Sequence, residues 1–123
     1  PIHSPVVRDL IENYSKELGI NRCAISDNEI LERCLYLMIN EGANIIEEKI
    51  ALRPSDIDVI WLNGYKFPRS RGGPMFLADK MGLENVYAGI VKYRDVHGAR
   101  WEPSLLLKVL SESNRKFSDL NIV

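Results

Sequence analysis

Apolar side chains recur along most of the chain at intervals of three and four residues, the spacing of one face of an α-helix. The first such segment covers residues 5–18 and ends before Gly19. The second follows Ser26, which forms a capping box with Glu29, and continues to about Ile50. The pattern therefore predicts an amphipathic helix over 5–18 and a long helix over 27–50.

The long helix is expected to be the central core element, because its apolar members cover about half of its circumference. Its polar positions Asn40, Asn44, Glu47 and Glu48 are expected to face solvent, with Glu41 at the border of the apolar face. No His or Ser stands at a spacing that would make Glu41 a general base, so we interpret it as a carboxylate that reaches solvent or pairs with Arg. The expected apolar face comprises Leu31, Cys34, Leu35, Met38, Ile39, Ile45, Ile46 and Ile50.

Further helices are predicted over 54–63, 74–80, 84–96 and 103–113, where prolines supply three of the starts and glycines supply stops. Gly64 is expected to end the first of these in a left-handed cap. No alternating strand pattern is present, so the predicted fold class is all-α. We expect one compact domain of five to six helices at 1–113 and a flexible tail at 114–123.

Length and composition are typical of one globular domain. A chain of 123 residues can bury a core without staples. Its two cysteines, Cys23 and Cys34, lack the spacing of a zinc site or of a disulfide framework, and Cys34 is expected to act as a small core residue. No apolar run reaches membrane-spanning length. The cysteine usage favours an intracellular protein.

Charge is distributed unevenly, although the net charge is only −1. Residues 1–58 carry 6 basic and 11 acidic side chains, a net charge of −5, whereas residues 66–100 carry 7 basic and 3 acidic ones, a net charge of +4. The overall balance argues against nucleic acid as a partner. The asymmetry is interpreted as solvated faces, with a site for an acidic ligand as the alternative.

The most distinctive chemistry lies in the loop after residue 64. Arg69, Arg71, Gly72 and Gly73 lead into the helix start at Pro74, and guanidinium groups beside free helix amides could bind a phosphate or carboxylate. The alternative is that the glycines turn the chain and the arginines pair with the acidic long helix. The neighbouring aromatic residues suit either core closure or a buried protein contact; they are Trp61, Tyr65 and Phe67.

Other motifs are missing from the sequence. The Gly72-Gly73 pair has neither the preceding strand nor the glycine spacing of a nucleotide-binding loop. His3 and His97 are isolated, and no nucleophile–base pair is recognisable. We therefore expect no catalytic, cofactor-binding or metal-binding residue in this chain.

Several motifs together resemble one known family, the C-terminal domain of 3-hydroxyacyl-CoA dehydrogenases. The resemblance covers about residues 24–97, and it is closest to the second copy of that domain in multifunctional fatty-acid β-oxidation proteins that join enoyl-CoA hydratase and 3-hydroxyacyl-CoA dehydrogenase. The motifs are Glu32-Arg33-Cys34-Leu35-Tyr36, Asn40-Glu41-Gly42-Ala43, Ser55-Asp56-Ile57-Asp58, Asn63-Gly64-Tyr65 and Arg71-Gly72-Gly73-Pro74-Met75.

The resemblance implies a helical domain similar to the 6-phosphogluconate dehydrogenase C-terminal-like fold, which packs against the first copy of the same domain. In such a parent, NAD and the catalytic residues belong to a Rossmann domain and to an element ahead of the first copy, so this segment alone is expected to be inactive. Implied partners are the first copy, the Rossmann domain, the acyl-CoA substrate and a thiolase subunit of a β-oxidation complex. The implied location is cytoplasmic in bacteria, and peroxisomal or mitochondrial in eukaryotes.

Two positions depart from the family pattern. Lys66 stands where the family commonly has Gly after the tyrosine, and Ser70 stands where an aromatic residue often precedes Arg-Gly-Gly-Pro. Two other functions stay open at this point: an acyl-CoA phosphate-binding module that uses Arg69 and Arg71, and a stand-alone homodimeric interaction domain.

Overall fold

The computed structural model describes residues 4–121, and within that range the chain forms helices joined by turns, without strands. The all-α prediction is confirmed. In chain order, the elements are α1 (Pro5–Glu17), α2 (Asp27–Glu47), α3 (Pro54–Gly64), η1 (Arg69–Arg71), α4 (Pro74–Met81), α5 (Leu83–His97), η2 (Ala99–Trp101), α6 (Leu105–Glu112) and η3 (Phe117–Leu120). None of the helices in 4–121 is long and apolar enough to cross a membrane.

The chain divides into two compact units, which meet at Ile30 and Leu31 within α2. The first unit contains α1, which begins with Pro5 in its first turn and has no buried residue. Its apolar positions recur on one face as predicted, and all are more than half exposed: Val6, Val7, Leu10, Ile11, Tyr14 and Leu18.

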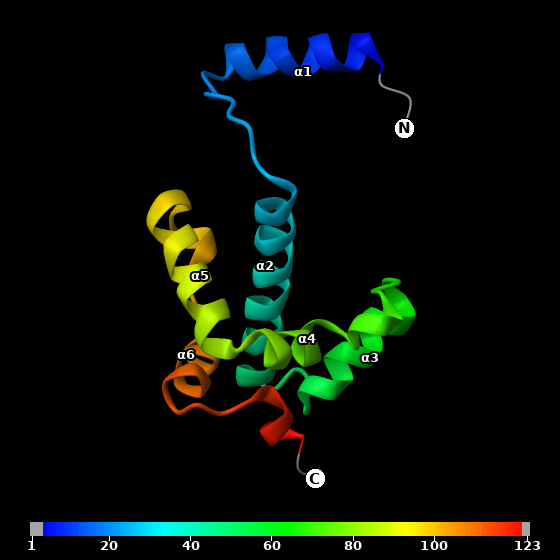
Figure 1. Cartoon of the computed structure of the whole chain (residues 1–123), viewed down its shortest axis with the longest axis vertical. Helices are drawn as coiled ribbons and strands as arrows, with labels where there is room; N and C mark the ends of the chain where they lie inside the picture. The colour runs from blue at the N-terminus through cyan, green and yellow to red at the C-terminus, as the bar shows by residue number, and fades with distance from the viewer. Residues whose placement is uncertain (1–3, 122–123) are drawn as a thin grey trace. The chain divides into compact units, whose positions relative to one another are not determined.

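The second unit is built around α2, with α3 and α4 near its C-terminal half and α5 beside it (Figure 1). Within this unit α3 packs on α4, and α5 packs on α4 and α6. Their inward side chains form one apolar core. Its fully or almost fully buried members include Ile39, Ala43, Met75, Ala78, Val86, Ile90, Leu107, Leu110 and Phe117.

The core-facing side of α2 differs from the predicted one. Leu31 is 58% exposed and Cys34 is also exposed, whereas Tyr36, Ile39 and Ala43 are buried. The helix is therefore turned about a quarter of a circle from its expected orientation. Its predicted apolar face is only partly used by this chain.

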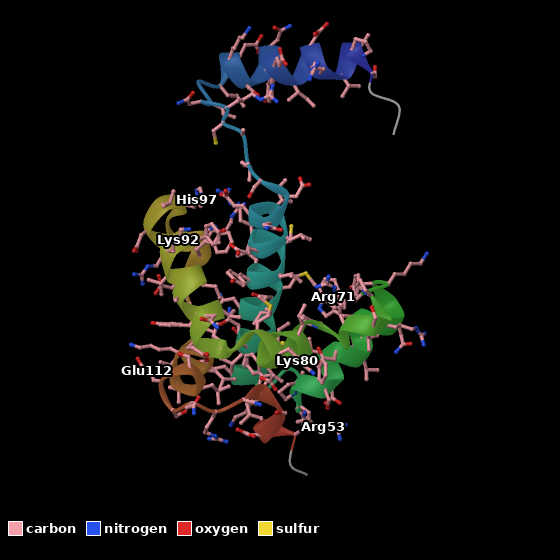
Figure 2. All side chains as sticks on the ribbon, in the orientation of Figure 1. Arg53, Arg71, Lys80, Lys92, His97 and Glu112 are labelled. Atoms are coloured by element: carbon pink, nitrogen blue, oxygen red, sulfur yellow. The ribbon has the colours of Figure 1, made fainter. Side chains whose placement is uncertain are left out.

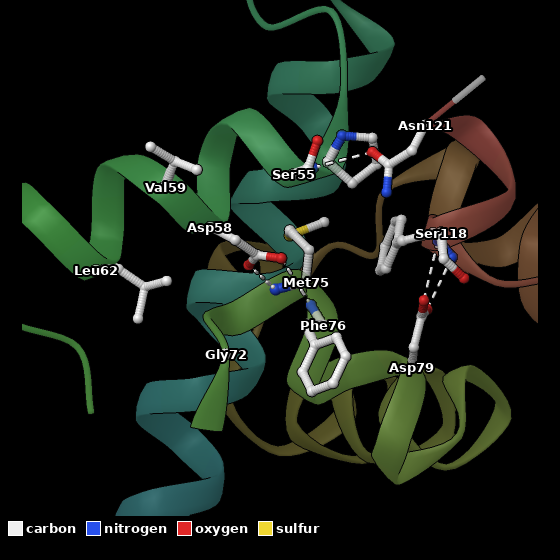
Figure 3. Close-up of a pocket in the computed structure, with 12 residues that line it drawn as sticks. Ser55, Asp58, Val59, Leu62, Gly72, Met75, Phe76, Asp79, Ser118 and Asn121 are labelled. Atoms are coloured by element: carbon white, nitrogen blue, oxygen red, sulfur yellow. Dashed lines mark hydrogen bonds between the residues drawn. The ribbon is translucent and has the colours of Figure 1, made fainter. Parts of the chain in front are cut away.

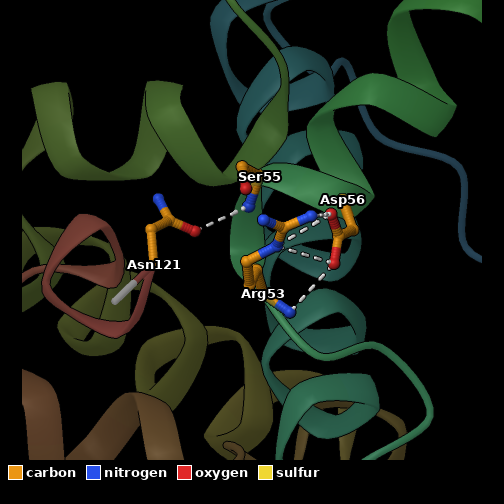
Figure 4. Close-up of polar contacts among 4 residues, drawn as sticks. All are labelled: Arg53, Ser55, Asp56 and Asn121. Carbon is orange, nitrogen blue, oxygen red and sulfur yellow. Dashed lines mark hydrogen bonds and ion pairs between the residues drawn. The ribbon is translucent and has the colours of Figure 1, made fainter. Parts of the chain in front are cut away.

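The C-terminal segment is also packed, in place of the flexible tail expected from Asn114. Phe117 is completely buried, and its N–H donates to Asp79 Oδ1 at 2.8 Å. Further on, the side chain of Asn121 accepts from the Ser55 N–H at 3.1 Å, which ties the segment to the start of α3 (Figure 4). Helical structure thus extends at least to Leu120.

Gly64 does not form the left-handed cap that the sequence predicts. It is the last residue of α3, and the left-handed conformation falls two residues later, on Lys66, with φ of 57°. The same helix begins at Pro54, as predicted. Asp56 accepts from the Arg53 N–H and from its guanidinium group, with the shortest contact at 2.8 Å (Figure 4), and this hydrogen bond lowers the pKa of Asp56.

Candidate functional site

Two of the sequence motifs meet at Asp58. This residue belongs to α3, and its carboxylate accepts from the N–H of Met75 at 2.8 Å and from the N–H of Phe76 at 3.0 Å (Figure 3). Both donors lie in the first turn of α4, where amides have no partner within the helix. Gly73 stands at the N-cap position and has no side chain to accept from them. Asp58 therefore caps α4 from a different helix.

The two glycines before α4 make this contact possible. Gly73 has φ of 103° and Gly72 has φ of 75°, a region that strongly favours glycine. A Cβ at Gly73 would collide with the side chain of Asp58, and one at Gly72 would collide with the ring of Phe76. The Gly-Gly pair thus allows close approach of backbone and carboxylate within one protein, and its observed role is structural.

The carboxyl group of Asp58 has an unusual environment for an acid. Burial raises its pKa, the hydrogen bonds from Met75 and Phe76 lower it in part, and the charge of Asp79 raises it slightly, so that the net direction is upward. Asp58 is only 8% exposed. This combination is typical of a carboxylate kept inside a domain to satisfy backbone amides.

The proposed anion site at the start of α4 is already occupied by this carboxylate. The amides that a phosphate would need are those of Met75 and Phe76, and both donate to Asp58. Arg69 and Arg71 lie in η1 and are exposed. Neither forms an ion pair with another residue in 4–121, so the expected pairing with the acidic long helix is wrong.

The basic side chains labelled in Figure 2 do not gather around one centre. Figure 2 shows Arg71 beside α3, Lys92 and His97 along α5, and Arg53 at the opposite end of the unit. Within the described residues there is no group of three or more His, Cys, Asp or Glu side chains that could hold a metal ion.

The three aromatic candidates form one cluster at the end of α3. The Trp61 ring lies 4.8 Å from that of Tyr65 and 6.5 Å from that of Phe67, measured between centroids. Phe67 is buried, Trp61 is half-buried, and Tyr65 is 68% exposed. The cluster therefore both closes the core and presents an aromatic surface to the outside.

A pocket of about 290 Å³ lies around Asp58, between α3, α4 and the C-terminal segment (Figure 3). Its second carboxylate, Asp79, accepts from the N–H of Phe117 at 2.8 Å and of Ser118 at 2.9 Å. Both carboxylates of the pocket are thus engaged by backbone amides. The arrangement joins three segments of the chain.

A second polar joint connects α2 to the start of α6. Asn40 accepts from the Ser104 N–H at 2.8 Å and donates to the Glu102 carbonyl at 2.9 Å. Glu47 accepts from the Ser104 hydroxyl at 3.1 Å and from the Leu106 N–H at 3.2 Å. Asn40 is 5% exposed, so the prediction that it faces solvent is wrong.

Sequence reasoning missed Asn40, Asp58 and Asp79 as joining residues. One signal was available: a helix that begins Gly73-Pro74 offers no side-chain cap of its own, so an acceptor has to come from elsewhere in the fold. Asp58 lies near the start of α3, where an acidic side chain ordinarily complements the dipole of its own helix. The partners of Asn40 lie more than sixty residues away, beyond the reach of local patterns.

The fold and these joints define an all-α domain whose signature residues connect its helices. Comparison with known families agrees: the model of the 3-hydroxyacyl-CoA dehydrogenase C-terminal domain matches residues 30–118. The chain belongs to this family, and the resemblance seen in the sequence is confirmed.

Individual relatives are much longer proteins. The peroxisomal bifunctional enzyme of Danio rerio is 49% identical over 110 residues, which are 86% of this chain and 15% of the relative. The human peroxisomal bifunctional enzyme is 43% identical over 109 residues, 87% of this chain and 15% of the relative. The fatty acid oxidation complex subunit alpha of Shewanella halifaxensis is 34% identical over 89 residues, 72% of this chain and 13% of the relative. The chain thus spans only about 15% of the length of the first two relatives.

Proposed function

We propose that this chain is the non-catalytic C-terminal helical domain of a multifunctional fatty-acid β-oxidation protein. In this proposal the parent oxidises 3-hydroxyacyl-CoA to 3-oxoacyl-CoA with NAD, and the segment packs against the paired copy of the same domain. The supporting observation is that residues of the family motifs connect the helices of the domain to one another. Asp58, Gly72 and Gly73 bring α3 and α4 together, and Asn40 holds the start of α6.

The longer relatives support the same view of the parent. Because the chain spans about 15% of their length, a parent of similar size has room for a nucleotide-binding domain and for another helical domain. NAD and the acyl-CoA substrate would then bind outside this segment. The names of the eukaryotic relatives favour the peroxisomal location, one of those that the resemblance implies. A thiolase partner is proposed from the resemblance alone.

The test is a direct activity measurement. The purified chain is mixed with NAD and 3-hydroxyacyl-CoA of several chain lengths, and formation of NADH is followed by absorbance beside the full-length parent. We expect turnover by the parent and none by the chain alone. Turnover by the chain at a rate near that of the parent would overturn the proposal.

A second candidate function is binding of acyl-CoA phosphates by the η1 loop. It is favoured by the exposure of Arg69 and Arg71, which have no carboxylate partner in 4–121, and it is opposed by the occupied amides of α4. Calorimetry with CoA at low and moderate salt distinguishes phosphate binding by this loop from a purely structural role. Heat of binding that disappears in Arg71→Ala but persists in Lys108→Ala would support this function, whereas no heat with the wild type would exclude it.

A further inference from the structure

A basic surface extends from the η1 loop to the outer side of α4. Residues 64–80 contain four basic side chains and one acidic one, a net charge of +3. All four basic side chains are exposed: Lys66, Arg69, Arg71 and Lys80. None of them forms an ion pair with another residue in 4–121, whereas Lys108 on α6 pairs with Glu112. The basic surface is therefore not neutralised by carboxylates of the chain itself.

Two exposed aromatic rings belong to the basic surface. The ring of Phe76 is 49% exposed, and it lies against Gly72 at the end of η1, where a Cβ would collide with it (Figure 3). The Nζ of Lys80 lies 5.4 Å from the centroid of the same ring. Phe76 thus connects the cations of the η1 loop to Lys80. At the other end of the loop, Tyr65 is exposed and directly precedes Lys66.

The loop that carries these side chains is tied to the domain by its backbone. The N–H of Phe67 donates to the Trp61 carbonyl at 3.0 Å, and the N–H of Arg71 donates to the Pro68 carbonyl at 2.9 Å. The side chain of Phe67 is buried. A loop that is already ordered loses little conformational entropy when a partner binds. The cations are therefore presented to a partner in a preorganised arrangement.

The chemistry of the basic surface favours carboxylates that belong to a protein segment. Guanidinium groups bind carboxylates and phosphates alike, but phosphate sites at helix starts also use free backbone amides. At α4 the amides of Met75 and Phe76 already donate to Asp58. The aromatic rings beside the cations offer apolar contact area, which suits side chains such as Leu or Phe between acidic ones. Clusters of Arg are a recurring means of recognising acidic motifs.

We propose that the basic surface binds an acidic segment of a second protein, in which Asp or Glu residues alternate with apolar ones. The carboxylates pair with Lys66, Arg69, Arg71 and Lys80, and the apolar side chains pack on Tyr65 and Phe76. Because the cations are exposed, the attraction is screened by salt and acts strongly on the association rate. This inference concerns binding alone and does not rest on the proposed function.

Fluorescence anisotropy tests the inference with a dye-labelled peptide that alternates Glu with Leu and Phe. The peptide is titrated with the 123-residue chain and with the full-length parent, at low and at moderate salt. We expect both proteins to bind it, with a Kd that rises with salt. A peptide with Ala in place of Leu and Phe should bind at least about threefold more weakly, because it lacks the apolar contacts with the two rings.

Substitutions locate the binding surface. Replacing both Arg69 and Arg71 by Ala should raise the Kd about tenfold, since two exposed charge pairs are lost. Lys108→Ala is the matched control, because it also removes one positive charge but lies on α6 and is paired with Glu112; its Kd should equal that of the wild type. Far-UV circular dichroism checks that the variants are folded.

No binding at low salt, or an unchanged Kd after the replacement of Arg69 and Arg71, would overturn the inference. Binding by the 123-residue chain but not by the parent would also overturn it, because the parent would then cover the basic surface itself. CoA and a single-stranded RNA are added as competitors. If either displaced the labelled peptide at a lower concentration than the unlabelled peptide does, the surface would be a phosphate site. Self-association of the chain that disappears in Arg71→Ala, measured by sedimentation, would assign the surface to a second copy and would likewise contradict the inference.

Discussion

Asp58 shows how one side chain can serve two elements. It belongs to α3, but its carboxylate accepts hydrogen bonds from two backbone amides of α4, at 2.8 and 3.0 Å. A buried carboxylate is stabilised when backbone N–H groups donate to it, and the amides would cost free energy if left without a partner. This contact requires glycine at position 73, because a Cβ there would collide with the side chain of Asp58.

The pKa of Asp58 gives a prediction about pH. Burial raises this pKa in the folded chain, so the folded state binds the proton more tightly than the unfolded state does. The contribution of Asp58 to the free energy of unfolding should be largest below about pH 4, the unfolded value, and should decline as the pH rises through the folded pKa. Asp58→Asn removes this titration and places an amide NH₂ against a backbone N–H, at a cost of about 1–3 kcal/mol.

Urea unfolding of both proteins between pH 4 and pH 7 measures the effect. The difference in free energy of unfolding between wild type and Asp58→Asn should shrink as the pH rises. A difference that grew with pH would mean that the carboxylate is stabilised in its charged form, contrary to the expected sign.

Replacing Lys66 by glycine is expected to increase the stability of the chain. It adopts φ of 57°, a left-handed conformation that costs an L-residue roughly 1–2 kcal/mol. Lys66→Gly should therefore raise the free energy of unfolding by up to about 1 kcal/mol, because the greater freedom of glycine in the unfolded chain offsets part of the gain. Lys66→Ala keeps the Cβ and is the control, for which thermal melts should show no gain. Equal stabilisation by both variants would assign the effect to charge.

At the scale of the element, helix starts were the most predictable feature of the sequence. Ser26 accepts from the Glu29 N–H at 3.2 Å, as the capping box requires, and Pro54 and Pro74 open α3 and α4. These signals are local, because a cap involves residues within one turn. The family motifs likewise identified the domain, although they did not say which residues touch.

The orientation of α2 could not be predicted for a physical reason. Apolar residues cover so much of the helix that periodicity alone does not decide which side packs inward. The outcome depends on distant partners, such as Ser104 for Asn40 and Tyr93 beside Tyr36. The contacts of the candidate site were equally hard to predict, because the acceptor for the Met75 and Phe76 amides, Asp58, comes from the preceding helix.

Phe117 tests the role of the C-terminal segment. Its side chain is 0% exposed and joins the core, so Phe117→Ala should lower the free energy of unfolding by about 3–5 kcal/mol through lost burial and a new cavity. Leu105→Ala, at a position 62% exposed, should cost less than about 0.5 kcal/mol. Similar denaturation midpoints for the two variants would show that the segment is not part of the core.

Asn40 tests the joint between α2 and α6. Asn40→Ala removes the acceptor for the Ser104 N–H and the donor to the Glu102 carbonyl, so it should cost about 2–3 kcal/mol by leaving buried groups without partners. The matched control is Asn63→Ala, because Asn63 is exposed and donates only within its own helix. Chemical denaturation should separate the two, and a negligible cost at Asn40 would restore the first expectation that it faces solvent.

At the scale of the whole molecule, the two units contribute differently to similarity and to stability. The family match begins at residue 30, yet the matches to the Danio rerio and human relatives cover 86% and 87% of the chain, more than residues 30–123 can supply. Sequence similarity therefore extends into the first unit. Among residues 4–121, the members of the buried core all follow Leu31.

This contrast leads to a prediction for truncated chains. Helix α1 has 13 residues and no buried side chain, and a helix of this length is marginal in water without a partner. Deletion of residues 1–24 keeps the Ser26 cap of α2 and should change the free energy of unfolding of the second unit by less than about 0.5 kcal/mol. Deletion from Asn114 onward removes fewer residues but includes Phe117, and it should cost at least about 3 kcal/mol. Urea unfolding followed by Trp fluorescence measures both, because Trp61 and Trp101 lie in the second unit. A large loss on removing 1–24 would show that α1 stabilises the domain that the family match defines.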